Sequence, residues 1–270
     1  DFSAIEARVV AWLAGEEWVL DVFRRGEGLY EATASQMFGV PIEKVTKDLR
    51  TKGKIATLAC GYGGGPNALV AMGALKMGLA AHELRTIVDQ WRAANARIVA
   101  YWRAVESAAI SAICGRPREL PHGVRFEASD GALRVRLPAG RELVYIDARV
   151  ESDPRWEGRQ IITYRGADAD EDERVGARIK TYGGKLVENI TQAVARDCLA
   201  ETLLRLEVEM PEAPVVLHIH DEVVLEVPDS IAPDDAISRV VEIMRRPMPW
   251  APDLPLDADA FATPYYRADD

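Results

Sequence analysis

The hydrophobic period of this chain changes near residue 116, and that change constrains the fold more than any other feature of the sequence. Up to residue 113, apolar side chains recur at spacings of three and four, which predicts helices at 4–13, 17–24, 30–38, 46–62, 82–94 and 97–113. From residue 116 to 150 the period is two, because Leu133, Val135 and Leu137 alternate with arginines. A hairpin or small meander is therefore predicted to follow a helical region.

The helical period returns at 186–206 and 231–244, on either side of a predicted strand pair at 214–228. Helices and antiparallel strands in separate stretches predict an α+β fold. With 270 residues, 48% of them hydrophobic, the chain is long enough for one large or two modest cores. The acidic run at 168–173 is predicted to be a solvated loop, although such a run can also bind cations.

Composition narrows the class of protein. No apolar run approaches the roughly 18 residues of a membrane helix, and the start lacks the features of a signal peptide, so we expect a cytoplasmic protein. The three cysteines form no CxxC pair, which argues against a disulfide framework or a zinc site. A net charge of -10 disfavours a nucleic-acid partner unless cations gather locally.

The stretch VLHIHDEVVLEV places charged side chains at a tight turn between two apolar strands. His220, Asp221 and Glu222 interrupt the alternation there. Such a turn holds carboxylates rigidly, as a metal site requires. The alternatives are an ordinary polar hairpin tip and the His-Asp pair of metal-dependent phosphohydrolases.

The stretch DLRTKGKIATLACGYG carries a basic stripe along one predicted helix. Arg50, Lys54, Leu58 and Tyr62 recur every four residues and so lie along one side. A guanidinium and an ammonium one turn apart can grip adjacent phosphates of a triphosphate, and an aromatic ring beside glycines suits a flat ligand. The alternative is a solvated basic face.

The chain opens on DFSAIEARV, with no methionine. Asp1 and Glu6 are acidic and lie on either side of the predicted start of a helix. Taken alone, this stretch is best interpreted as a helix with Asp1 as its structural cap.

Together, DFSAIEAR, RTKGKIATLACGYG and HDEVVLEV resemble, in this order, motifs A, B and C of the family A DNA polymerases, the group of bacterial polymerase I and many phage replicative enzymes. YGGKLVENITQAVARD, before the third motif, is also typical of phage-like members. The resemblance runs nearly end to end. It implies a polymerase palm with an antiparallel sheet at 1–14 and 116–270, and mainly helical fingers at 15–115 that carry the motif B helix.

The resemblance implies template-directed DNA synthesis from dNTPs on primer-template DNA, in the cytoplasm of a bacterium or a phage-infected host. Two Mg²⁺ ions, with Mn²⁺ as an alternative, would be the cofactors. Their ligands would be the Asp1 and Asp221 carboxylates and the Phe2 backbone carbonyl. Glu222 stands at the accessory acidic position, and His220 stands where the primer terminus is contacted.

Other positions match family residues that bind nucleotide and DNA. Arg50 and Lys54 match residues that bind the triphosphate, and Lys54 is also the candidate general acid toward pyrophosphate. Tyr62 matches the aromatic beside the templating position, and Gly63 lets the base pass. Glu6 matches the residue that closes the sugar pocket against a 2′-hydroxyl. Arg8 and Gln192 match two residues that support the primer-template.

Three departures from the family pattern accompany these matches. Leu58 replaces the usual aromatic of the motif B helix, which puts the usual stacking on the sugar in question. Ala4 stands where the family often has Gln, and Glu188 where it often has Asn, so one or two contacts to DNA are expected to be lost.

The resemblance covers neither a thumb nor an exonuclease region. We therefore interpret Asp1 as a metal ligand in a chain cut directly before it, and we expect the isolated chain to bind DNA weakly and to need the N-terminal region for activity. The alternative from another class of function is a fragment that binds nucleic acid and catalyses no reaction. Metal-dependent nucleotide incorporation on a primed template separates the two.

Overall fold

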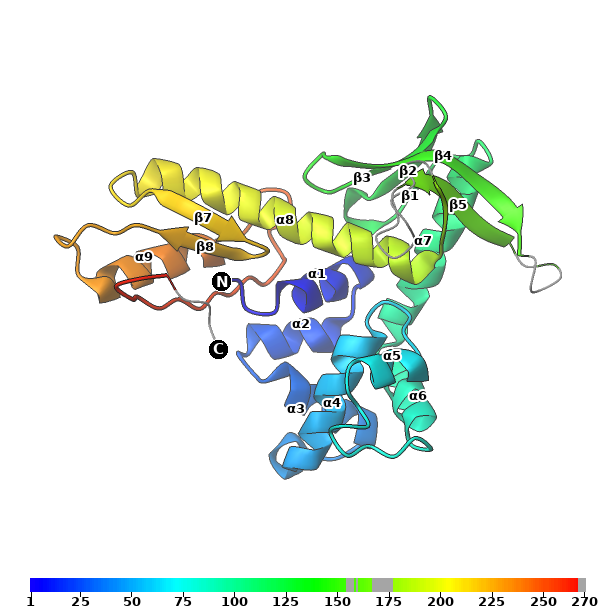
Figure 1. Cartoon of the computed structure of the whole chain (residues 1–270), viewed down its shortest axis with the longest axis horizontal. Coiled ribbons are helices and arrows are strands. Elements are labelled where there is room, and N and C mark those ends of the chain that lie inside the picture. Colours follow the sequence, from blue (N-terminus) through cyan, green and yellow to red (C-terminus); the bar gives the residue numbers. More distant parts are fainter. Residues whose placement is uncertain (154–157, 159, 167–176, 267–270) are drawn as a thin grey trace. The chain divides into compact units, whose positions relative to one another are not determined.

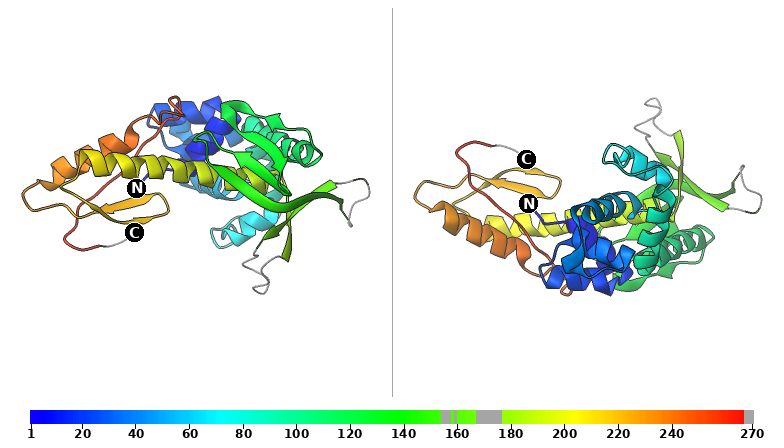
Figure 2. Two further views of the ribbon diagram at one scale, coloured as in Figure 1. Left: turned by 90° about the horizontal axis from the view of Figure 1, so that it is seen from above. Right: turned by 90° about the horizontal axis from the view of Figure 1, so that it is seen from below.

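A computed structural model describes residues 1–153, 158, 160–166 and 177–266 (Figures 1 and 2). The acidic run at 168–173 lies outside these residues. The chain divides into two compact units, residues 1–9 with 192–270 and residues 10–191. Mixed helices and antiparallel strands confirm the α+β prediction. Residues 116–191 group with the helices before them, so these units differ from the predicted palm and fingers, which stay a prediction.

The helices expected before residue 116 are all present, each within two residues of its predicted bounds. They are α1 (Ile5–Ala14), α2 (Glu17–Arg24), α3 (Leu29–Phe38), α4 (Lys47–Cys60), α6 (Leu84–Ala94) and α7 (Ala96–Ile113). A further helix, α5 (Pro66–Ala71), was not predicted. Its proline at the first helical position favours a helix start directly after the glycines, which the sequence pattern indicated only as a break. Single 3-10 turns lie at η1 (Ile42–Lys44) and η2 (Pro121–Gly123).

Helix α4 packs closely on α3 because Gly53 faces it. A Cβ at Gly53 would lie 2.4 Å from the Tyr30 carbonyl oxygen and 3.2 Å from the Ala34 Cβ. Only glycine permits this approach of the two helix backbones. At its N-terminus, α4 is capped by Thr46, whose hydroxyl accepts a hydrogen bond from the Leu49 N–H at 3.3 Å.

One antiparallel sheet follows α7, in the order β1 to β6. Its strands are β1 (Arg118–Glu119), β2 (Arg125–Ser129), β3 (Ala132–Arg136), β4 (Glu142–Ser152), β5 (Gln160–Gly166) and β6 (Ala177–Thr181). The predicted meander at 116–150 is confirmed, and β5 and β6 extend it. Phe126 pairs with Val135, and Leu133 with Tyr145. All four are buried on the face against which α7 packs (Figure 1).

The other unit is built around the second part of α8 (Gly183–Glu209), the hairpin of β7 (Val215–Ile219) and β8 (Glu222–Leu225), and α9 (Pro233–Arg245). Phe2, 1% exposed, joins this core and forms an antiparallel bridge with Ala258. Within the described residues, no helix combines the length and apolar character that a membrane span requires.

Candidate active site

The first three residues lie between two segments from the far end of the chain. The Asp1 carbonyl accepts a hydrogen bond from Asp259 at 3.0 Å, and the Ser3 N–H donates to the Asp257 carbonyl at 2.9 Å. On the other side, the Phe2 N–H donates to the Asp221 carbonyl at 3.3 Å. Motifs A and C are therefore neighbours in the fold, although 220 positions separate Asp1 from Asp221.

Motif C is a two-residue turn between β7 and β8. Ile219 pairs with Glu222 across the hairpin, which leaves His220 and Asp221 at its tip. His220 is exposed and has a left-handed backbone with φ of 51°, a conformation that a tight turn demands and that histidine adopts more readily than most residues. Asp221 and Glu222 are partly exposed, so both carboxylates are accessible to a ligand.

The donor atoms at this point suit Mg²⁺. Asp1 is exposed. Phe2 is buried, and its backbone carbonyl is a hard oxygen donor of the kind that Mg²⁺ prefers. The described part of the chain contains no group of three or more His, Cys, Asp or Glu side chains that could hold a metal. Mg²⁺ is usually bound through one or two carboxylates, with substrate phosphates and waters completing the shell.

Two further site residues, Glu6 on α1 and Gln192 on α8, contact each other. The Gln192 Nε2 donates to a Glu6 carboxylate oxygen at 3.4 Å. Both residues are exposed. The amide therefore contacts the carboxylate that the family resemblance assigns to the sugar pocket, a role that stays a prediction.

Arg8, predicted to support DNA, is buried and bonded within the protein. Its guanidinium donates to the carbonyls of Ser3 at 2.7 Å and Pro255 at 3.0 Å, and lies 3.6 Å from the Asp257 carboxylate. Burial lowers the pKa of Arg8 from its ordinary value. Its geometry favours a supporting role, in which it holds the Ser3 turn beside Asp1, and its role toward DNA stays a prediction.

In the unit of residues 10–191, the basic stripe of α4 lies over an aromatic ring. The Arg50 guanidinium carbon lies 5.5 Å and the Lys54 Nζ 5.8 Å from the centroid of the Tyr30 ring. Arg50 also forms an ion pair with Glu31. Both cations stay accessible, with the Arg50 side chain 45% exposed, and one carboxylate neutralises only part of their charge. Sequence reasoning missed Tyr30 and Glu31, because they lie on α3 and only the Gly53 contact brings them here.

The rest of the stripe continues to the end of α4 and just beyond it. Leu58 is 49% exposed, although its helix packs on three others, α3, α5 and α6. The helix ends at Cys60, two residues earlier than predicted, so Tyr62 and Gly63 belong to the turn that follows. Gly63 has a φ of 86°, which only glycine adopts without strain.

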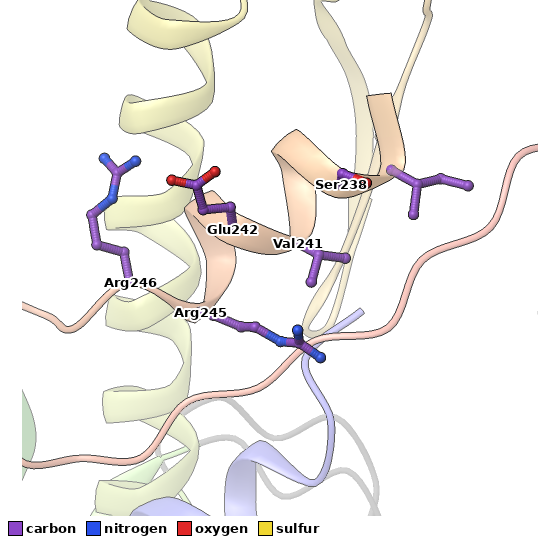
Figure 3. A pocket seen from close by; sticks show the side chains of 6 residues that line it. Ser238, Val241, Glu242, Arg245 and Arg246 are labelled. Carbon is purple, nitrogen blue, oxygen red and sulfur yellow. The ribbon is translucent and has the colours of Figure 1, made fainter. Parts of the chain in front are cut away.

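The hollow shown in Figure 3 lies elsewhere. It has a volume of about 550 Å³ and is lined by one face of α9, including Ser238, Val241 and Glu242. Two arginines complete it, and both are paired: Arg245 with Asp257, and Arg246 with Glu209. None of the predicted site residues lines this hollow, so it carries no part of the site.

Comparison with known proteins gives the family. The model of DNA polymerase family A matches residues 1–134. The DNA polymerase of Bacillus phage SP02 is 52% identical over the whole of this chain, which covers 41% of that protein. The chain belongs to DNA polymerase family A. This membership confirms the resemblance carried by motifs A, B and C.

Other family A proteins agree. DNA polymerase I of Pseudomonas aeruginosa is 28% identical over 96% of the chain, which covers 23% of its length. Among solved structures, the POL domain of Pol1 from M. smegmatis, in complex with DNA primer-template and dNTP, matches 95% of the chain with a TM-score of 0.62. At 21% identity this match supports the fold alone, and the chain covers 37% of that structure. The chain thus spans less than half the length of these relatives.

Proposed function

We propose that this chain provides the nucleotidyl-transfer site of a template-directed DNA polymerase. In this reaction the oxygen of a primer 3′-hydroxyl bonds to the α-phosphorus of a dNTP as its proton leaves, and the bond to pyrophosphate breaks. The observation that supports the proposal most strongly is the Phe2 to Asp221 hydrogen bond, because it joins the two motifs that would share the metal ions.

Asp1, Asp221 and the Phe2 carbonyl would hold two Mg²⁺, with Mn²⁺ as an alternative. When bound, these ions would activate the primer hydroxyl and stabilise the charge of the triphosphate. Glu222 adds a second carboxylate beside Asp221, and His220, exposed at the tip of the hairpin, would contact the primer terminus.

Residues 10–191 supply the groups for the nucleotide and the template. Arg50 and Lys54 would bind the triphosphate, and Lys54 would donate a proton to the departing pyrophosphate. Bound phosphates would compete with Glu31 for Arg50, since two anions share one guanidinium. Tyr62 and Gly63 would border the templating base.

The test uses the 270-residue chain and a chimera in which it replaces the matched 41% of the Bacillus phage SP02 polymerase. We expect Mg²⁺-dependent incorporation by the chimera and little by the chain alone, because the chain covers only 41% of the SP02 polymerase and the chimera supplies the rest. Asp1→Asn and Asp221→Asn should each lower turnover by about 10²-fold or more, since charge stabilisation in the transition state is lost.

The matched control is Asp229→Asn, which removes an exposed carboxylate beyond β8 and should leave turnover unchanged. Folding of all variants is checked by circular dichroism. Full activity in either site variant would overturn the metal assignment. DNA binding without incorporation by the chimera would instead support the non-catalytic alternative.

A further inference from the structure

The turn that follows α4, residues 61–64, is held by side chains from other elements of its unit. Each of its four consecutive carbonyl oxygens accepts one hydrogen bond. Trp102 Nε1 donates to the Gly61 carbonyl at 3.0 Å, and Tyr182 Oη donates to the Tyr62 carbonyl at 3.4 Å. One Nη of Arg92 donates to the carbonyls of Gly63 at 3.4 Å and Gly64 at 3.1 Å. We call these residues the 61–64 turn.

Arg92, on α6, is the one charged donor among the three residues that hold the turn. Its Nε is buried and has no hydrogen-bond partner, and within the described residues its guanidinium pairs with no carboxylate. Arg92 is half-buried, and a cation that is partly withdrawn from water is costly unless polar atoms compensate it. The carbonyls of Gly63 and Gly64 supply that compensation, so the position of Arg92 favours the turn conformation in which both point toward it.

Two glycines, Gly64 in the turn and Gly184 on α8, allow close backbone contacts around the turn. A Cβ at Gly64 would lie 1.9 Å from the Ala59 carbonyl oxygen, and a Cβ at Gly184 would lie 2.2 Å from the Tyr62 carbonyl oxygen. Trp102 is itself fixed by stacking on Trp91, with ring centroids 6.1 Å apart and planes 7° from parallel. Loss of Arg92 would therefore free the Gly63–Gly64 end while Trp102 still holds the Gly61 end.

We propose that Arg92 is a positioning residue for the templating base, acting through the carbonyls of Gly63 and Gly64. The proposal rests on the proposed function, in which Tyr62 and Gly63 border that base. Arg92 does not touch the nucleotide in this account. Without it, Gly63 samples more backbone conformations, and the templating base is held in a wider range of positions.

The experiment compares Arg92→Met and Arg92→Lys with Arg85→Met, a control on the same helix whose side chain is 74% exposed. The first readout is hydrogen exchange of the backbone amides at 61–64 in the 270-residue chain. We expect exchange about tenfold faster in Arg92→Met, as for loss of a hydrogen bond to a charged donor, and an intermediate rate in Arg92→Lys, whose ammonium can still reach one carbonyl. Arg85→Met should match the wild type.

The second readout is the fluorescence of 2-aminopurine at the templating position of a primer-template that is saturated with the SP02 chimera carrying each variant. We expect brighter emission, from a less ordered base, in Arg92→Met, with partial return in Arg92→Lys. Unchanged exchange in both Arg92 variants would overturn the proposal, and so would faster exchange with unchanged emission. A wild-type chimera that binds the primer-template and leaves the emission unaltered would overturn the proposed function, whereas the exchange data of the 270-residue chain would still report on the turn.

Discussion

At the residue scale, the Gln192 amide is a contact that helps to orient the Glu6 carboxylate. Gln192 donates to it at 3.4 Å, and both side chains are exposed. We expect Glu6→Ala to lower the preference for dNTPs over ribonucleotides by about tenfold or more, because the bulk and charge that oppose a 2′-hydroxyl are removed. Gln192→Leu should also lower this preference, but by less, because the Glu6 carboxylate stays in place and loses only its hydrogen bond from Gln192.

The measurement is the ratio of kcat/KM for the two nucleotides in the SP02 chimera. Glu207→Ala, an exposed carboxylate on the same helix as Gln192, is the control. An unchanged ratio in Glu6→Ala would remove Glu6 from sugar selection. A change in Glu6→Ala alone would show that Gln192 does not orient it.

At the element scale, the α3–α4 contact is expected to couple stability to nucleotide binding. Gly53→Ala places a methyl group 2.4 Å from the Tyr30 carbonyl oxygen, so α3 must shift and the Tyr30 ring moves from beneath Arg50 and Lys54. We expect a loss of about 1–3 kcal/mol in stability and a higher KM for dNTPs. Gly65→Ala, outside the 61–64 turn, is the control, because its Cβ would meet no atom within 4 Å. Equal effects of the two substitutions would contradict this account.

One carboxylate links three neighbouring strands of the large sheet, β4, β5 and β6. Asp147, on β4 at a bulge, pairs with Arg149, Arg165 and Arg178. The hydrogen bond from Arg165 is the main cause that holds the pKa of Asp147 below its ordinary value of 3.8. Because the folded state lowers this pKa, its stabilisation is present above pH 3.8 and is lost as the pH falls through the lowered pKa.

Asp147→Asn should therefore lower the Tm at pH 7, and the difference from wild type should shrink below about pH 3.8. Asn tolerates the left-handed backbone that Asp147 adopts, with φ of 51°, so the change isolates the charge. The control is Asp130→Asn, at φ of 52°, whose side chain is 85% exposed and meets Arg134 only at 3.9 Å. A Tm difference that is independent of pH would show that the ion pairs are not its source.

These elements also show where sequence patterns suffice. Helical periodicity located α4 within two residues, because its amphipathic stripe and the glycines after it are local signals. The helix α5 has only six residues, which is too short for a helical spacing of apolar residues to be recognised in the sequence. Strands β5 and β6 flank the acidic run and pair through non-local contacts, so the sequence pattern ended the meander too early.

At the scale of the whole molecule, motif order located the candidate site, while contacts between distant residues stayed hidden. The sequence indicated that Asp1 and Asp221 belong together only through the family resemblance, since no local pattern links residues 220 positions apart. It gave no sign that Arg8 would be buried against Asp257, or that Arg92 and Trp102 would hold the 61–64 turn. Burial and hydrogen-bond partners depend on packing between elements, and a single sequence does not encode them in any local period.

The net charge of -10 is a property of the whole chain, and it is expected to affect the rate at which DNA binds. A net negative field opposes the approach of DNA, and this effect depends on total charge rather than on contacts. Replacing the five acids at 168–173 by Asn and Gln removes half of that excess, so association of the 270-residue chain with primer-template should become faster at low salt.

The gain should disappear at about 1 M salt, where the Debye length is only about 3 Å. Stopped-flow association rates at several salt concentrations provide the measurement. The control exchanges each Asp of the run for Glu and each Glu for Asp, which alters every side chain there and keeps the charge. A gain that persists at high salt, or that the control reproduces, would mean that the run acts through its own contacts and not through the field of the protein.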